Sequence, residues 1–596
     1  MKNNKKQIGI AMIISMVLMI VGFAFVNASP SAQEETPKVS LLMAAIIAIF
    51  YYLAQSPWYA NLGFAVFQRP LMAGLIVGLI MGRPAEGVAM GASINVLYLG
   101  WISAGGSLPG DPAMAGYLGT AIALGSGLGV EGALAIAAPL GLLGTITWSV
   151  RMSVCSIFAH KADAEAEKGN IWGVARANYV YSQTMLFFLY AVPVFLAAYF
   201  GAPAVAAVLG WIGGNAGWII SGLFVASGML AALGIALNLK FLLQGDVWPY
   251  FFVGFVVTSM MTGGVNLLMF AVIGAAMAFM HVLFTSKKEE GEAAPVFDAS
   301  ATKATPGLLT RRDVFNSWWR WLFFSHANYN WERLQGTGFA HAMAPIIEKL
   351  YKSKEDIVAA LQRHLIFFNT QPDFGGVIFG IVIAMEEERA AGADISDEAI
   401  NGVKVGLMGP FAGIGDSIQQ GIIIPIAIAL GMSIATGGQI GVAERGSALG
   451  PIVFLLIMMA WSWGFGWWIY YLGYRQGQSA VTNLLASNAL NKLITGASVL
   501  GNFIMGALAV SFISLSTPIV FSIGGNNFNI QQVLNDIMPN LLELVLVLVI
   551  WWLLKKKNVS PTLIMVALIV IGILGAIPIF WGLDGAGQAI RVGLFG

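Results

Sequence analysis

The chain has 596 residues, of which 58% are hydrophobic and 10% are charged, and its formal net charge is +1. A soluble domain carries roughly 25% charged residues, so this composition excludes an ordinary soluble protein and predicts an all-α, polytopic membrane protein. The near-zero charge gives no support for a nucleic-acid partner, and the single Cys155 excludes an internal disulfide framework or a cysteine-based metal site.

Residues 1–38 predict an N-terminal membrane helix followed by a polar tail. Lys2, Lys5 and Lys6 precede the apolar run 8–26. A basic start, an apolar run and small residues also fit a cleaved signal peptide, but the run is long for a signal core. We therefore expect an uncleaved helix.

Residues 39–285 read as a first membrane unit. Residues 177–239 and 247–286 contain no Asp, Glu, Lys or Arg, and each run exceeds the ~20 residues that cross a bilayer. The block 203–239 has room for two crossings, or for one crossing and a re-entrant piece. We expect further spans near residues 41–55, 70–82, 86–102, 112–127, 130–150, 178–199 and 248–283.

Residues 286–312 are charged, rich in Ala, Pro and Thr, and predict a linker. Lys287, Lys288, Arg311 and Arg312, near its two ends, place it in the cytoplasm. The second unit, 313–596, begins with amphipathic patterns that are too charged to span, so we expect helices at the membrane surface or packed under the unit. These patterns cover 313–324, 333–351 and 354–368, and spans resume near 417–435, 451–474, 493–515, 539–554 and 561–581.

Asp416 stands at the mouth of an apolar run, in the stretch NGVKVGLMGPFAGIGD. An ionisable group at such a place marks a pathway or binding site by default. The surrounding Gly and Pro residues predict broken helix, which membrane proteins tolerate where it lines a cavity. Asp111 stands similarly among Gly and Pro in GGSLPGDPAMAG, and paired interruptions of this kind point to a transporter site. Two unrelated turns would look the same.

The second half resembles the IID subunit of the mannose family of the bacterial sugar phosphotransferase system. The resemblance rests on NWERLQGTGFAHAMAPIIEKLY (330–351), RHLIFFNTQP (363–372), EEERAAGADISDEAINGVKVGLMGPFAGIGDSI (386–418) and LITGASVLGNFIMGALA (493–509). The first half resembles the partner IIC subunit in QRPLMAGLIVGLIMGRPAEGVAMGASINVLYLGWISAGGSLPGDPAMAG (68–116) and AHKADAEAEKGN (159–170). The two subunits are usually separate chains, and here they are joined by the linker.

The resemblance implies a multi-pass sugar permease of the bacterial inner membrane, with interlocked IIC and IID parts and a trimeric assembly. It implies sugar as the substrate and cytoplasmic IIA and IIB proteins as partners that phosphorylate the sugar as it enters. We expect no catalytic residue, cofactor or metal in this chain, because no phosphate-carrying domain is evident in it. The segment ANLGFAVF (60–67) lacks the acids of mannose-type relatives, which leaves an N-acetylhexosamine such as N-acetylgalactosamine, or sorbose, as alternatives.

Sugar binding needs buried amides and carboxylates inside an apolar wall. Asn95 lies in an otherwise apolar span, where it serves either the sugar or an interhelical hydrogen bond. Gln371 precedes Pro372 at a helix exit, where polar side chains either reach a cavity or cap the helix. The candidates are Gln68, Asn95, Ser107 and Asp111 in the first half, and Asn330, Glu332, Asn369, Gln371 and Asp416 in the second.

Other patterns carry little weight. The five histidines show no metal or triad spacing, so we expect surface or packed side chains. GLGVEG (127–132) lacks the preceding strand of a dinucleotide site, and GPFAGIGD lacks the Lys of a P-loop. Without the resemblance, Asp111 and Asp416 alone suggest an ion-coupled secondary transporter of a small polar solute. A structural or receptor membrane protein is the third class.

Overall fold

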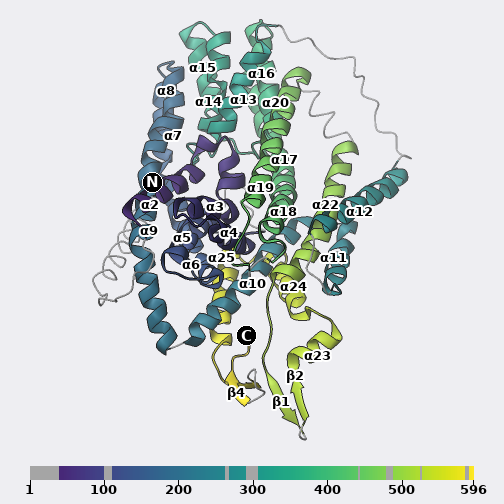
Figure 1. Cartoon of the computed structure of the whole chain (residues 1–596). Coiled ribbons are helices and arrows are strands. Elements are labelled where there is room, and N and C mark those ends of the chain that lie inside the picture. The colour runs from purple at the N-terminus through teal and green to yellow at the C-terminus, as the bar shows by residue number, and fades with distance from the viewer. Residues whose placement is uncertain are drawn as a thin grey trace.

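The computed structural model describes residues 39–595 apart from 100–109, 216, 244, 262–266, 290–306, 440–442, 478–487, 524–525 and 584–588. Helices dominate the described chain, and two small antiparallel hairpins lie at one end, near the C-terminus (Figure 1). The predicted all-α polytopic class is therefore confirmed. The expected N-terminal helix, most of the linker and Ser107 lie outside the described residues.

The first half is built from helices of very different lengths. Ser40 caps the first described helix by accepting a hydrogen bond from the Met43 amide, and proline opens three of the following helices. The elements are α2 (Leu41–Gln55), η1 (Pro57–Tyr59), η2 (Gly63–Phe67), α3 (Pro70–Ile80), α4 (Pro84–Leu97), α5 (Pro112–Gly125), α6 (Val130–Val154), α7 (Ser156–Ala166), α8 (Ile171–Arg176), η4 (Ala177–Tyr181), α9 (Ser182–Asn215), α10 (Gly217–Leu242), η5 (Gly245–Val247), α11 (Pro249–Ser259) and α12 (Leu267–Glu289).

The expectation of separate spans near 70–82 and 86–102 is wrong. With 11 and 14 residues, α3 and α4 are only ~16 and ~21 Å long, which is short of the ~30 Å hydrocarbon core. They pack side by side as a buried hairpin. A Cβ on Gly74 would stand 2.2 Å from the carbonyl oxygen of Gly87, so only glycine permits this approach.

The second half starts with the same order of elements as the first. A helix, a loop, a pair of packed helices, another loop and a further helix follow one another in both. The elements are α13 (Arg311–Phe324), α14 (Gly336–Leu350), α15 (Lys354–His364), α16 (Gly376–Ala390), α17 (Asp397–Gly415), η6 (Asp416–Ile423), α18 (Ile424–Thr436), α19 (Leu449–Met459), η7 (Ala460–Phe465), α20 (Gly466–Gln476), α22 (Asn488–Phe512), β1 (Val520–Ile523), β2 (Asn526–Asn529), α23 (Ile530–Ile537), α24 (Leu541–Lys555), α25 (Pro561–Gly575), β3 (Phe580–Leu583) and β4 (Ala589–Val592).

Asp416 does not lie at a broken helix, contrary to the sequence-based expectation. Helix starts at Asp397, about twenty residues earlier than predicted, and runs to Thr436. The Gly and Pro residues, Pro410 among them, lie within α17, and a π-helical segment, η6, begins directly after them at Asp416. Such wide turns appear frequently at functional sites. By element order, the counterpart of the loop that holds Asp111 is the loop 365–375 before α16.

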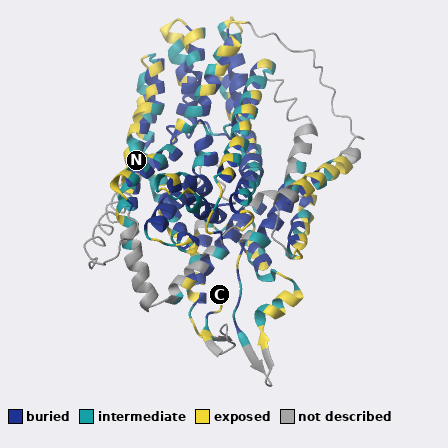
Figure 2. Ribbon diagram, in the orientation of Figure 1, coloured by how far each residue is buried: buried dark blue, intermediate teal, exposed yellow. Residues whose placement is uncertain are grey.

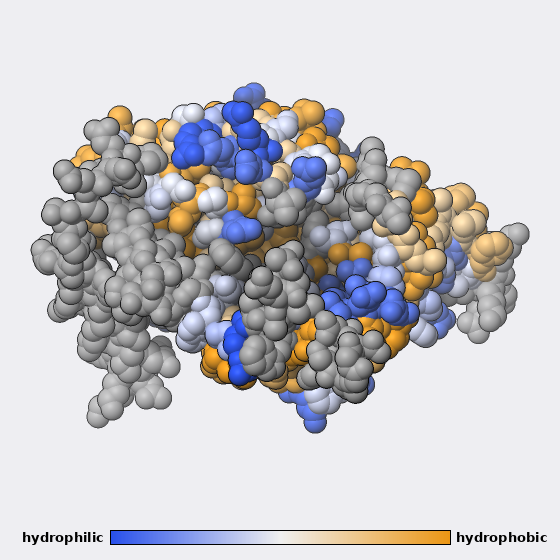
Figure 3. Space-filling view, turned by 60° about the horizontal axis from the view of Figure 1, so that its bottom comes forward, coloured by the Kyte–Doolittle hydropathy of each residue, from blue (hydrophilic) through white to orange (hydrophobic). Residues whose placement is uncertain are grey.

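In the described part of the chain, four helices are long and apolar enough to cross a membrane, and a fifth results if the bent pair α23–α24 is one span. Many large apolar side chains on these and neighbouring helices are exposed, as expected for surfaces that face lipid. The end view in Figure 3 shows hydrophobic residues over much of the visible rim, with hydrophilic patches between them. The four long spans cover 130–166, 171–201, 397–436 and 449–476.

The two halves interlock through their helices. Helix α10 packs against α24 and α25, and α11 and α12 pack against α22, so the last helices of the chain lie among those of the first half. Gly254 and Gly506 mark the closest approach, because a Cβ at either would stand about 2 Å from a backbone oxygen of the other helix. Figure 2 shows the buried residues gathered in the centre, where one apolar core draws on both halves.

Polar contacts also tie the halves together. Arg333 of the second half binds Asp163 of the first through two parallel hydrogen bonds of 2.5 and 2.6 Å. The amide of Gln183 donates to the carbonyl oxygen of Ala327 at 2.6 Å. Bidentate pairs of this kind add geometric specificity as well as energy. The halves therefore hold each other without help from the linker.

We predict that the linker is dispensable for assembly. If the chain is cut between residues 290 and 306 and the two pieces are co-expressed, they should co-purify in detergent, because every contact described above survives the cut and a tether adds only effective concentration. Replacing both Gly254 and Gly506 by Leu should abolish co-purification. Purification of the first piece without the second, when neither glycine is replaced, would contradict the prediction.

A buried ionic cluster stabilises the bundle α13–α16. The carboxylate of Glu386 accepts two hydrogen bonds from Arg363, at 2.7 and 2.8 Å, and one of 2.9 Å from His364. Tyr351 also donates to it, and Lys404 lies close to the cluster. Burial opposes ionisation of Glu386, but the hydrogen bonds from His364 and Arg363 outweigh it and lower its pKa. Burial lowers the pKa of His364 to about 4.

We predict that acid destabilises this bundle. Both groups bind fewer protons in the folded state than in the unfolded state, where their pKa values are roughly 4.3 and 6.5. Their contribution is therefore complete above pH ~6.5 and declines as the pH falls, first through His364 and then through Glu386. The thermal unfolding temperature of the purified protein should fall steadily from pH 7 to pH 4.

Glu386→Gln should destabilise by about 3–5 kcal/mol, because it removes the buried carboxylate of Arg363 and leaves the guanidinium only its 3.2 Å contact with partly exposed Asp397. The matched control is Glu388→Gln on the same helix, which removes the same charge from a partly exposed position and should change stability by less than about 0.5 kcal/mol. Equal effects of the two variants would refute a special role for the cluster.

Candidate functional site

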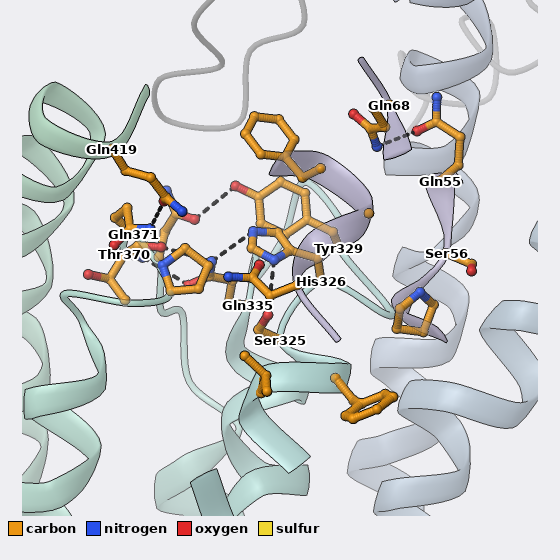
Figure 4. Close-up of a pocket in the computed structure, with 18 of the residues that line it drawn as sticks. Gln55, Ser56, Gln68, Ser325, His326, Tyr329, Gln335, Thr370, Gln371 and Gln419 are labelled. Carbon is orange, nitrogen blue, oxygen red and sulfur yellow. Dashed lines mark hydrogen bonds between the residues drawn. The ribbon is translucent and has the colours of Figure 1, made fainter. Parts of the chain in front are cut away.

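A partly open cavity lies at the junction of the two halves. It holds about 950 Å³ of space between atoms, a volume that includes its mouth open to solvent. Figure 4 shows side chains of both halves converging on it. Its polar lining consists of Gln55, Ser56, Asn61, Gln68, Arg151, Ser325, His326, Tyr329, Gln335, Asn369, Thr370, Gln371, Asp416, Gln419 and Gln420.

Interrupted backbone forms the wall that the first half contributes. Helix α2 ends at Gln55, Ser56 and Pro57 start the short turn η1, and Pro70 starts α3. Gln68 therefore stands just outside a helix, and its amide nitrogen donates to the side-chain oxygen of Gln55 at 2.9 Å. Behind them Asp111, which caps α5 and lies outside the lining, accepts from the amide nitrogen of Gln55 at 3.1 and 3.2 Å.

The second half contributes the loop 365–375 and the π-helical segment η6. Gln371 donates to the side-chain oxygen of Gln419, and Gln419 donates to buried Asp373 at 2.7 Å. Asn369 accepts from the hydroxyl of Tyr329 at 2.8 Å. The wide turn of η6 brings Asp416, Gln419 and Gln420 to the cavity together.

Arg151 supplies a buried cation at the junction. It lies in the long helix α6, it is 3% exposed, and it donates to the carbonyl oxygens of Gln55 at 3.2 Å and His326 at 2.6 Å. Its guanidinium stacks over Trp148 at 5.0 Å. Because the two carbonyls belong to different halves, Arg151 joins the two walls of the cavity.

His326 lines the cavity as a neutral side chain. Burial, aided by the nearby charge of Arg151, lowers the pKa of His326 to about 3. Its ring nitrogens lie 3.0 Å from the Ser325 hydroxyl and 3.0 Å from the amide nitrogen of Gln335, which can only donate. The ring therefore accepts from Gln335 and donates to Ser325.

The structure brings together four of the residues predicted from sequence. Gln68, Asn369, Gln371 and Asp416 all line the cavity, although they come from both halves. Asp111 does not line the cavity but lies behind Gln55, and it accepts hydrogen bonds from Gln55 and Tyr51.

Three other predicted residues lie outside the lining. The side-chain oxygen of Asn95 accepts from the Leu71 amide at 3.3 Å, so it serves the α3–α4 hairpin. Asn330 accepts from the amides of Glu332 and Arg333 and shapes a turn. Glu332 pairs on the surface with His160, at 3.1 Å and 43% exposed.

Sequence reasoning missed Gln55, Arg151, His326, Gln335 and Gln419. Arg151 could have been predicted from the sequence, because an arginine inside an apolar helix is costly and therefore indicates a functional role. Gln55 and Gln419 lie in apolar helices, so the criterion that selected Asn95, a buried amide in an apolar span, applies to them as well. Nothing in the sequence places His326 and Gln335 at the cavity, because they lie in a loop whose position depends on tertiary packing.

Comparisons with known proteins identify the class of each half. A family model described as "PTS system sorbose-specific iic component" matches residues 41–280, and one described as "PTS system mannose/fructose/sorbose family IID component" matches residues 308–580. The chain is 43% identical to the sorbose-specific EIID component of Klebsiella pneumoniae, over 42% of this chain and 89% of that protein. It is 40% identical to the fructose permease IID component of Bacillus subtilis, over 45% and 95%. It is 28% identical to the mannose-specific EIIC component of Escherichia coli K12, over 38% and 84%.

The two family models together define the class of the chain as a permease of the sugar phosphotransferase system. More particularly, the chain belongs to the mannose/fructose/sorbose family of that system, and it carries the IIC and IID components in one polypeptide.

We predict that Asp416→Asn lowers transport while leaving the protein in the membrane. Asp416 lines the cavity and accepts from Gln420 at 2.7 Å, so the change removes a charge from the ligand's surroundings without altering shape. Uptake at low substrate concentration should fall at least about tenfold, which corresponds to ~1.4 kcal/mol. Glu332→Gln, which removes a carboxylate outside the lining, is the matched control and should transport normally. Equal uptake by both variants at equal expression would remove Asp416 from the site.

Proposed function

We propose that this chain is the inner-membrane permease of a phosphoenolpyruvate-dependent sugar phosphotransferase system, and that it translocates a hexose or amino-hexose through the cavity between its two halves. The observation that carries the proposal is the lining of this cavity, in which amide side chains from both halves converge. Amides both donate and accept hydrogen bonds, which suits a ligand covered with hydroxyl groups. An apolar ligand would leave unpaired the amide groups that hydrogen bonds within the lining do not satisfy, such as the oxygen of Gln68.

Membership of the family supports the partners that we propose. The system needs phosphoryl-carrying IIA and IIB proteins, and the IIB protein would phosphorylate the sugar on the cytoplasmic side. We also propose that the assembly is a trimer in the bacterial inner membrane, and that residues 39–285 and 313–596 act as its IIC and IID units. The linker 286–312 would lie in the cytoplasm; its first residues continue helix α12, which ends at Glu289.

The relatives named above are described by three different sugars: sorbose, fructose and mannose. We therefore propose a monosaccharide class, with sorbose and N-acetylgalactosamine as the first candidates. The segment 60–67, just before Gln68, holds no acidic residue, and this departure from mannose-type relatives is why mannose is not a first candidate. Asn61 of this segment lines the cavity and donates to buried Asp373 at 3.0 Å.

Uptake into vesicles tests the proposal. We expect wild-type vesicles to accumulate labelled sugar as sugar phosphate, and only when phosphoenolpyruvate and the cytoplasmic carrier proteins are enclosed. The panel consists of ¹⁴C-labelled sorbose, fructose, mannose and N-acetylgalactosamine. Accumulation of free sugar driven by a proton or sodium gradient would instead establish an ion-coupled transporter, and no uptake under either condition would leave a structural or receptor protein.

A further inference from the structure

One wall of the cavity carries a chain of three hydrogen-bonded side chains. Buried Asp111 accepts from the amide nitrogen of Gln55 at 3.1 Å, and the oxygen of Gln55 accepts from the amide nitrogen of Gln68 at 2.9 Å. The same nitrogen of Gln68 also donates to the backbone carbonyl of Ala54 at 3.3 Å. Gln55 and Gln68 line the cavity, whereas Asp111 lies behind them.

The opposite wall carries a second series of hydrogen-bonded side chains, again one aspartate and two glutamines. Buried Asp373 accepts from the amide nitrogen of Gln419 at 2.7 Å, and the oxygen of Gln419 accepts from the amide nitrogen of Gln371. The oxygen of Gln371 accepts from the Phe374 backbone amide at 2.7 Å. Both glutamines line the cavity and Asp373 does not. Figure 4 shows the two glutamine pairs on opposite sides of the cavity.

Each chain is anchored at both ends by groups of fixed polarity. An ionised carboxylate and a backbone carbonyl can only accept, and a backbone N–H can only donate. Asp111 at one end and the carbonyl of Ala54 at the other therefore require the nitrogens of Gln55 and Gln68 to point as they do. Asp373 and the Phe374 amide impose the same order on Gln419 and Gln371.

We propose that Asp111 and Asp373 are positioning residues that set the donor and acceptor pattern which four glutamines present to the sugar. The inference deepens the proposed function and rests on it. Neither aspartate touches the ligand. Each acts through a glutamine amide whose two ends have nearly the same shape. Without the aspartate, only the backbone group at the far end would hold the amides in this orientation.

The first chain predicts which group meets the sugar. Both hydrogens of the Gln68 amide are used, on Gln55 and Ala54, and its oxygen has no partner among the described residues. Gln68 therefore offers an acceptor, and the ligand group that meets it is a hydroxyl acting as donor. If the orientation of the Gln68 amide were not fixed, the amide could present either its nitrogen or its oxygen to the ligand. The site would then discriminate less between sugars.

The test measures KM and Vmax of uptake for the panel sugar that the wild type accumulates best. The amide nitrogen of Gln55 now donates to both oxygens of Asp111, at 3.1 and 3.2 Å. In Asp111→Asn a donor replaces the oxygen at 3.1 Å, so Gln55 loses one of its two acceptors and faces a second donor there. The Met114 amide still finds an acceptor, because asparagine caps helices as well as aspartate does. We expect KM to rise about tenfold to hundredfold with little change in Vmax, since one buried polar group is left unpaired.

Restoring the order of donors and acceptors should restore binding. In Asp111→Asn combined with Gln55→Glu, the new amide donates to the new carboxylate, whose other oxygen accepts from Gln68 as Gln55 did. Gln55→Glu alone sets two carboxylates against each other and should raise KM as well. The double variant should recover most of the loss, which two independent structural defects would not.

The opposite wall offers the same test. Gln419→Glu should raise KM, and Gln419→Glu combined with Asp373→Asn should recover it, because the new amide donates to the new carboxylate and Gln371 keeps its acceptor. Glu332→Gln, outside the lining, is the unchanged control. The inference would be overturned if, in either series of hydrogen-bonded side chains, the double variant had a KM as high as its worse single variant.

The outcomes separate the inference from the proposed function. If wild-type vesicles show no carrier-dependent uptake, the proposed function fails. If wild type transports and Asp111→Asn keeps the wild-type KM, only the inference fails. A measurement on the purified full chain does not depend on transport: the infrared difference spectrum of wild type minus Asp111→Asn should contain the bands of an ionised carboxylate. A protonated carboxyl band in its place would overturn the acceptor role of Asp111.

Discussion

The structure depends on one constraint, that a polar group buried in a membrane protein must find its partner inside the protein. Each half of this chain interrupts its helices where it meets the other half, after α2 in the first and after α15 in the second. The freed backbone and the amides beside it are satisfied by one another and by groups of the opposite half. The cavity therefore lies where the helices of the two halves are interrupted. Its lining is polar because the amides at these interruptions pair with one another.

Buried ionisable side chains meet the same requirement for internal partners at three places. Arg151 is buried where it bonds carbonyls of both halves, so its cost is offset by two hydrogen bonds and by stacking on Trp148. The cluster around Glu386 neutralises itself inside the bundle α13–α16. Asp111 and Asp373 are met by donors from neighbouring side chains. In each case the buried group organises the polar side chains around it, which a purely apolar core cannot do.

The fusion of two components fits the way in which the halves interlock. Because α22, α24 and α25 lie among the helices of the first half, neither half buries its apolar surface alone. The loop 56–69 of the first half and the loops 325–335 and 365–375 of the second half meet at the cavity. This arrangement lets Asn61 and Asp373, which are 312 positions apart in the chain, meet in one hydrogen bond.

The sequence by itself determined the membrane class, the two units with a polar segment between them, and four of the cavity residues. It did so because apolar runs of membrane length are rare in soluble domains, and because polar residues beside Gly and Pro within such runs are costly without a role. It also directed attention to Asp416, although the π-helical segment that brings this residue to the cavity is seen only in the structure.

Only the tertiary structure decided the rest. The α3–α4 hairpin reads as two spans until its glycines are seen to pack, and the Gly and Pro residues before Asp416 read as a break although a continuous helix absorbs them. Asn95, Asn330 and Glu332 have the chemistry of a sugar site, but their partners are a backbone amide, a turn and a surface histidine. The pairing of each aspartate with two glutamines depends on contacts between separate helices, and a pattern along one chain does not contain the distances that set those contacts.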